Sequence, residues 1–167
     1  MKFTDAVEII LKHESGYVWN PRDPGGETNF GIAKNFYPDL DIKNLTRNQA
    51  IEIYRRDFWE KCKIELLPSP LRLIVFDCAV NQGPQVSIAL LQAALGVKAD
   101  GDLGPDTLNA IAKANLEKLV QKYSRARLNR YFDNRNFAVF GEGWVCRLNE
   151  ISMIAAAQVG ELKGAQV

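Results

Sequence analysis

The sequence is short of the residues on which many catalytic and metal sites are built. It holds one histidine, His13, and three widely spaced cysteines, Cys62, Cys78 and Cys146. A histidine-based catalytic triad or a zinc site is hard to build with one imidazole, and an odd number of separated cysteines indicates reduced, mostly buried thiols rather than a disulfide framework. The residues therefore imply no metal and no organic cofactor.

Long apolar runs are missing as well. Acidic residues follow the first methionine within a few positions, before a secretory or membrane-spanning segment can form. We therefore expect a protein that is made in the cytoplasm and that does not insert stably into a membrane.

A large net charge is also absent, because 21 basic residues nearly balance 20 acidic ones. This balance disfavours a strongly basic nucleic-acid-binding protein. It hides one cationic segment, residues 111–135, which carries seven basic and two acidic residues. The simplest interpretation of this segment is a solvated helix face, with a surface that attracts anions as the alternative.

The rest of the composition is that of an ordinary globular protein, with 47% hydrophobic and 25% charged residues. The length of 167 residues is enough for one domain or two small lobes. Helical spacing of the apolar residues predicts a mainly α-helical fold, in which Thr4 caps the first helix. A turn rich in proline and glycine predicts a small β-hairpin at about 17–32. The later helices are expected to begin near Thr46 and Pro105 and to cover about 71–82, 86–95, 114–132 and 143–159.

Glu14 stands out on the first predicted helix, which it closes. In ideal helix geometry it falls on the same stripe as Phe3, Val7 and Ile10. A carboxyl group in such a partly apolar setting has a raised pKa and can act as a general acid near neutrality. The alternative is a solvated residue at a frayed helix end.

Asp23 is a second carboxylate, nine positions after Glu14, in the predicted turn. Two carboxyl groups facing each other across a cleft, one protonated and one ionised, are the arrangement that glycoside hydrolysis requires. Thr28 and Asn29 follow on the return strand with a hydroxyl and an amide. Their alternatives are an Asp-Pro turn for Asp23 and ordinary edge-strand polarity for Thr28 and Asn29.

Two stretches, residues 13–18 (His-Glu-Ser-Gly-Tyr-Val) and 21–32 (Pro-Arg-Asp-Pro-Gly-Gly-Glu-Thr-Asn-Phe-Gly-Ile), resemble the signature of phage-type muramidases of glycoside hydrolase family 108. The resemblance implies a lysozyme-like fold and makes Glu14 the catalytic acid. This sequence has Ser15 where the family usually has glycine. A similar pattern in phage lysozymes implies that Asp23 is the second carboxylate and that Thr28 positions water or substrate.

Further resemblance begins at residues 76–83, which are similar to a family motif on a central helix. There we expect Asp77 to make structural hydrogen bonds and Asn81 and Gln82 to line a sugar cleft, with Tyr17 and Asn29 as further substrate-binding residues. Residues 90–107 resemble a small peptidoglycan-binding module. The expected organisation is a catalytic region over 1–85 and a peptidoglycan-binding-like region over 86–167, packed into one unit.

The resemblance implies a peptidoglycan-degrading N-acetylmuramidase, a monomer that serves as a phage endolysin and stays in the host cytoplasm until it reaches the wall. Its partner would be peptidoglycan glycan strands and not nucleic acid. Two alternatives remain, a lytic transglycosylase and a peptidoglycan-binding module without catalysis. A zinc peptidase is excluded, because Tyr17 stands where an HExxH motif beginning at His13 needs its second histidine.

Overall fold

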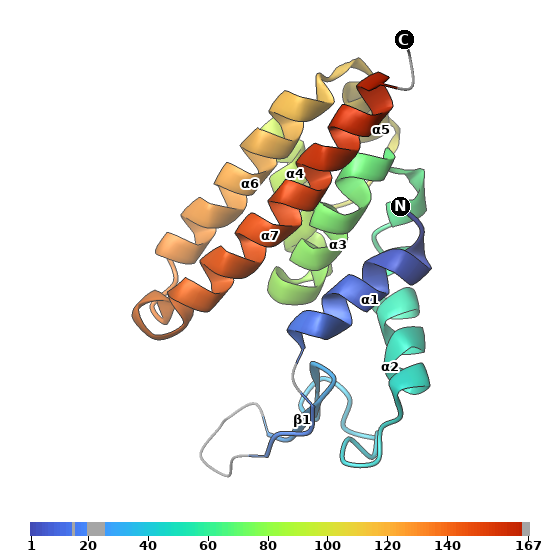
Figure 1. Cartoon of the computed structure of the whole chain (residues 1–167), viewed down its shortest axis with the longest axis vertical. Helices are drawn as coiled ribbons and strands as arrows, with labels where there is room; N and C mark the ends of the chain where they lie inside the picture. Colours follow the sequence, from blue (N-terminus) through green and yellow to red (C-terminus); the bar gives the residue numbers. More distant parts are fainter. Residues whose placement is uncertain (15, 20–25, 165–167) are drawn as a thin grey trace.

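The computed structural model describes residues 1–14, 16–19 and 26–164 (Figure 1). These residues form a mainly α-helical fold with one small antiparallel sheet, which confirms the predicted fold class. A π-helix (η1, Arg55–Glu60) extends α2, and a 3-10 helix (η2, Ile64–Leu66) precedes α3. The other elements, in chain order, are α1 (Phe3–His13), β1 (Thr28–Asn29), β2 (Ile32–Ala33), α2 (Arg47–Tyr54), α3 (Ser69–Gln82), α4 (Pro84–Leu95), α5 (Pro105–Lys113), α6 (Leu116–Phe132) and α7 (Phe137–Gly164).

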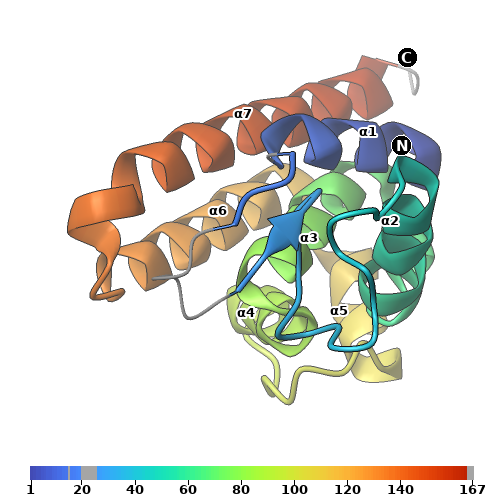
Figure 2. The same ribbon diagram turned by 90° about the horizontal axis from the view of Figure 1, so that it is seen from below.

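Helix α3 is the centre of the fold. All of its residues from Pro70 to Ala79 except Arg72 are buried, as expected for a helix that is apolar nearly all round. Helices α1, α4, α6 and α7 pack around it, and α6 and α7 run side by side as a long antiparallel pair (Figures 1 and 2). The chain breaks at Gly83, whose φ of 97° suits glycine, and Pro84 starts α4.

Helix α1 begins two residues earlier than the sequence predicted. Its N-cap is Lys2, whose backbone N–H donates to the Asp5 carboxylate at 3.2 Å, so the prediction that Thr4 caps the helix is wrong. The apolar face of α1 is held by aromatic contacts, with the Phe3 ring centroid 5.4 Å from that of Trp59. The helix ends at His13, and Glu14 is the C-cap residue with an extended backbone, which confirms that Glu14 closes this helix.

The small sheet lies at the end of the molecule towards which α1 points (Figure 1). Val18 and Thr28 exchange two backbone hydrogen bonds of 2.8 and 2.9 Å, so the two arms of the predicted hairpin do pair. The return strand is shorter than predicted, because the chain turns again at Phe30 and Gly31 and pairs β2 with β1. The turn has positive φ angles at both residues, 48° and 73°.

The cationic segment at 111–135 differs from the simplest prediction at one position. Six of its seven basic residues are exposed, but Arg127 on α6 is completely buried. Its guanidinium turns inward to α3, where it finds a carboxylate. Among the described residues, no helix combines the length and the apolar character needed to span a bilayer.

Candidate active site

Glu14 is held at the end of α1 by an arginine that lies 133 residues further along the chain. The Arg147 Nη1 atom donates to Glu14 Oε1 at 2.8 Å, and the two side chains are only 11% and 17% exposed. Arg147 comes from α7, which passes the end of α1. Glu14 is therefore half-buried, but it contacts a cation, where the sequence predicted a partly apolar setting.

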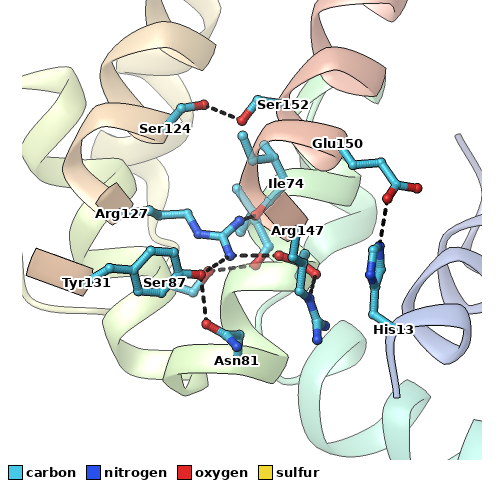
Figure 3. A network of polar contacts seen from close by, with 12 residues as sticks. His13, Ile74, Asn81, Ser87, Ser124, Arg127, Tyr131, Arg147, Glu150 and Ser152 are labelled. Atoms are coloured by element: carbon cyan, nitrogen blue, oxygen red, sulfur yellow. Dashed lines mark hydrogen bonds and ion pairs between the residues drawn. The ribbon is translucent and has the colours of Figure 1, made fainter. Parts of the chain in front are cut away.

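A second, longer contact lies at the same junction between α1 and α7. The Nε2 atom of His13 lies 3.5 Å from a carboxylate oxygen of Glu150, one turn after Arg147 on α7 (Figure 3). Two successive residues at the end of α1 thus lie next to two residues on one face of α7.

The other carboxylate oxygen of Glu14 faces the turn between β1 and β2. A Cβ atom placed on Gly31 would lie 2.5 Å from Glu14 Oε2 and 2.6 Å from the Tyr54 hydroxyl. Tyr54 donates that hydroxyl to the carbonyl of Phe30 at 2.9 Å, and burial together with the charge of Glu14 raises its pKa. Only a glycine lets the backbone approach the carboxylate this closely, so Gly31 and Tyr54 define the space next to Glu14 Oε2.

Arg147 also binds a carboxylate of α3, on its inner side. Its Nε atom donates to Asp77 Oδ1 at 2.7 Å, and Arg127 Nη2 donates to the other oxygen of Asp77, also at 2.7 Å. Burial alone would lower the pKa of Arg147, but the carboxylates of Asp77 and Glu14 outweigh it and raise that pKa. The negative charges of two carboxylates are thus balanced by the positive charges of two guanidinium groups. Asp77 has the structural hydrogen-bonding role that the sequence predicted.

The network reaches the surface at its far end. Arg127 Nη2 donates to the Tyr131 hydroxyl at 3.1 Å, and this hydroxyl donates to Asn81 Oδ1 at 2.8 Å (Figure 3). A continuous chain of polar contacts therefore runs from Glu14 through the core to Asn81.

Asn81 lies in a groove with a volume of about 870 Å³. The groove is walled by the β1–β2 turn and the segment after it, by η1, by the C-terminal end of α3, and by α6 and α7. Gly31 is part of its lining; Glu14 is not, but its Oε2 atom lies next to Gly31. The remaining lining is rich in aromatic and amide side chains: Phe36, Tyr37, Phe58, Tyr131, Trp144, Asn81, Gln82 and Asn134.

Of the residues that the sequence predicted for the site, some line the groove and others do not. Asn81 and Gln82 line the groove, and Thr28 lies in β1 and pairs through its backbone with Val18 and Ala33. Asn29 is buried, with its amide donating to the carbonyls of the loop after the sheet, including that of Ile42 at 3.0 Å.

Two further predicted residues lie away from these contacts. Tyr17 is 42% exposed and donates its hydroxyl to Glu27 at 3.0 Å. Asp23 lies outside the described residues.

The sequence alone assigned no role to several residues that this site depends on. Arg147 is remote in sequence from Glu14, and nothing local marks it as the partner of a carboxylate. Asp57 brings a carboxylate to the groove, where it accepts from the Tyr37 hydroxyl at 2.8 Å. The hydrogen bond and charge of Arg56 and the hydrogen bond from Tyr37 outweigh the effect of burial and lower the pKa of Asp57.

Comparisons with known proteins divide the chain at the start of α4. The model of the family Glycosyl hydrolase 108 matches residues 7–83, and that of the family Predicted Peptidoglycan domain matches residues 86–149. The solved structure of SagA from Brucella abortus is similar to this chain with a TM-score of 0.85 and 32% sequence identity, covering 93% of this chain and 94% of that chain. No curated protein gives a match. Glu14 lies in the first matched region and Arg147 in the second.

Proposed function

The chain belongs to glycosyl hydrolase family 108, and from this premise we propose that it is an N-acetylmuramidase that cleaves peptidoglycan between N-acetylmuramic acid and N-acetylglucosamine. The second matched region, a predicted peptidoglycan domain, supports peptidoglycan as the partner of this glycoside hydrolase. The observation that carries the proposal is the half-buried carboxylate of Glu14, next to a residue, Gly31, that lines an aromatic-rich groove.

In the proposed reaction, Glu14 protonates the oxygen of the glycosidic bond as the sugar–oxygen bond breaks. Arg147 occupies Oε1 of the carboxyl group, so Oε2, beside Gly31 and Tyr54, is the oxygen that gives up the proton. An ionised carboxylate must then stabilise the positive charge on the sugar or orient water. We assign this role to Asp23, with Thr28 helping to position the water.

The groove suits a glycan strand. Sugar rings present apolar faces that pack on aromatic side chains, and their polar groups need a few hydrogen-bonding partners between the aromatic contacts. Trp144 on α7 packs beside Tyr131 with ring centroids 5.4 Å apart, and Phe36, from the segment after β2, lines the same groove. Because both regions contribute residues to the lining of the groove, we propose that regions 1–85 and 86–167 act as one unit rather than as separable domains.

The proposed biological role is that of a phage endolysin, acting as a monomer on the host wall from the cytoplasmic side once the membrane is opened. Its support is the muramidase-type motif around Glu14. Expression in the cytoplasm of a bacterial host should cause lysis only when a membrane-permeabilising protein is produced as well. Lysis without such a protein would contradict this role.

The experiment that tests the enzymatic proposal is digestion of purified peptidoglycan by the full chain. A glycosidase releases soluble fragments with new sugar ends, in proportion to time and enzyme. Binding to the walls without release of fragments would instead favour a binding module.

Gly31→Ala is predicted to lower kcat at least tenfold. The added methyl group would meet Glu14 Oε2 and the Tyr54 hydroxyl at less than contact distance, so the carboxyl group must move. Gly26→Ala is the matched control: Gly26 has a similar φ of +74° but a Cβ there would meet only ordinary contacts, the nearest at 3.5 Å. Equal rates for the two variants on soluble glycan fragments would contradict the proposed position of the acid.

Charge reversal of Arg125 is predicted to slow the lysis of whole walls a few-fold, more strongly at low salt, because the exposed cations of α6 attract the anionic wall. Rates on short soluble fragments should not change. Arg127 is unsuitable for this test, since it is buried on Asp77. Lys43→Glu, on the loop before α2, is the control. Equal rates of wall lysis for both variants would show that the basic segment is only a solvated helix face.

A further inference from the structure

The turn that joins α6 to α7 carries apolar side chains that the fold leaves exposed. It lies at the end of the helix pair that is remote from α5 (Figures 1 and 2). Phe132, Val139 and Phe140 are 56%, 74% and 55% exposed. The rings of Phe132 and Phe137 pack on each other with centroids 5.0 Å apart. These four residues form what we call the apolar tip, and an exposed apolar cluster of this kind marks an interaction surface.

The apolar tip is separate from the lining of the groove. Its four residues are not among those that line the groove, whereas Tyr131 and Trp144 are. The ring centroid of Phe140 lies 6.0 Å from that of Trp144, so the apolar tip adjoins the groove without being part of it. The binding of a glycan strand in the groove therefore leaves the exposure of the apolar tip unexplained.

A stripe of cations leads along α6 to the apolar tip. Exposed side chains follow one another at spacings of four, three, four and three residues: Lys118, Lys122, Arg125, Asn129 and Phe132. At 100° per residue, these five positions span about 80° of the helix circumference and so lie on one face of α6. The three basic residues of this face, which we call the basic stripe, share it with no acidic residue of α6.

The combination of an apolar tip and a basic stripe restricts the partner. Next to the apolar tip the charges cancel, since Arg130 and Arg135 stand beside Asp133 and Glu142, so the excess positive charge lies along the basic stripe. An anionic polysaccharide or a nucleic acid would contact the basic stripe but leave the apolar tip in water. An anionic lipid bilayer matches both, because apolar side chains enter the boundary between headgroups and acyl chains while cations lie among the headgroups.

We propose that the apolar tip and the basic stripe dock the protein on an anionic lipid bilayer. The docking is peripheral and reversible, because only a few apolar side chains enter the bilayer. It does not depend on the proposed muramidase function. Since Phe140 lies next to Trp144 of the groove lining, docking also holds the groove close to the membrane surface.

The test is co-sedimentation of the full chain with vesicles of phosphatidylcholine alone or mixed with phosphatidylglycerol. The wild-type protein should bind the anionic vesicles at least tenfold more tightly than the neutral ones, and added salt should weaken this binding. Phe132→Ser combined with Val139→Ser should lower the affinity for anionic vesicles about tenfold, because it removes apolar contact with the bilayer. Met153→Ser is the matched control, since Met153 is 65% exposed on α7 but lies outside the apolar tip.

A second pair of substitutions tests the basic stripe. Lys122→Gln combined with Arg125→Gln should lower the affinity for anionic vesicles at least tenfold and leave binding to neutral vesicles unchanged. Lys43→Gln combined with Lys98→Gln removes the same charge from exposed residues outside α6 and α7 and should have little effect. Thermal unfolding of each variant shows whether it is folded.

The results that would overturn the docking proposal are distinct. Wild-type protein that does not bind anionic vesicles would overturn it, and so would binding that the apolar-tip variant leaves unchanged, which would be an effect of charge alone. A wild-type dimer that this variant dissociates would assign the apolar tip to a second copy of the chain. A lower rate on soluble glycan fragments with unchanged vesicle binding would assign it to the groove. Vesicle binding as predicted by a protein that cleaves no peptidoglycan would contradict only the proposed function.

Discussion

Glu14→Gln is expected to abolish the release of fragments from purified peptidoglycan while leaving the protein folded. The amide cannot deliver a proton to the leaving oxygen, and loss of a general acid lowers a rate by roughly 10²- to 10⁴-fold. Its shape still fits beside Gly31, and its carbonyl oxygen can still accept from Arg147, so the junction between α1 and α7 should form. The measurement is the initial rate of release of new sugar ends, together with thermal unfolding.

Glu52→Gln is the matched control for this change. Glu52 lies on α2, where its side chain is 71% exposed and faces Arg55 at 3.8 Å. This variant should keep the wild-type rate. A Glu14→Gln enzyme that still degrades peptidoglycan at the wild-type rate would show that Glu14 is not the acid.

Arg147→Met is expected to lower both activity and stability. Removal of one partner of a buried ion pair costs about 3–5 kcal/mol, but Asp77 keeps Arg127 and Arg147 is slightly exposed, so we expect a loss of about 2 kcal/mol. For a chain of this size that loss corresponds to a fall in Tm of roughly 4–8 °C. The freed carboxyl group of Glu14 can adopt other positions, so kcat should fall at least tenfold.

The effect on kcat and KM separates positioning from simple damage to the fold. Arg147 is not part of the groove lining, so KM should stay near its wild-type value while kcat falls. Arg147→Lys keeps the charge, but a single ammonium group cannot hold Asp77 and Glu14 at once as the guanidinium does. The rate and the stability of this variant should therefore lie between those of Arg147→Met and of the wild type.

Glu150→Gln is the control for this pair, since it weakens the neighbouring contact with His13 and leaves Arg147 in place. It should lower Tm slightly and keep kcat. Wild-type kcat in a folded Arg147→Met enzyme would contradict the positioning role.

Much of the fold could be predicted from the sequence because it is encoded locally. The start of α2 after Thr46, the start of α5 at Pro105 and the end of α3 at Gln82 all lie where the sequence places them. The single apolar face of α1 likewise indicates a peripheral helix, and the continuous apolar run of α3 indicates a central one. These features depend on residues within one or two turns of each other.

The polar interior could not be predicted in this way. Arg127 stands in a segment that is basic on average, and nothing in its neighbours distinguishes it from the exposed Arg125 two positions earlier. Its burial follows from the way α6 packs on α3, which brings it within 2.7 Å of Asp77, 50 residues away in sequence. The contact between Glu14 and Arg147 has the same character. Helical periodicity placed Glu14 on the inner stripe, but only the path of α7 provides its cation.

The most direct test of the muramidase proposal is mass spectrometry of the sugar ends that the wild-type protein creates in purified peptidoglycan, after reduction with borohydride. A muramidase leaves N-acetylmuramic acid at the new reducing end, so every released fragment should end in the reduced form of that sugar. Fragments that end in anhydro-muramic acid would identify a lytic transglycosylase, and reduced N-acetylglucosamine ends would place the cleavage at the other glycosidic bond. Either result would contradict the proposed muramidase activity.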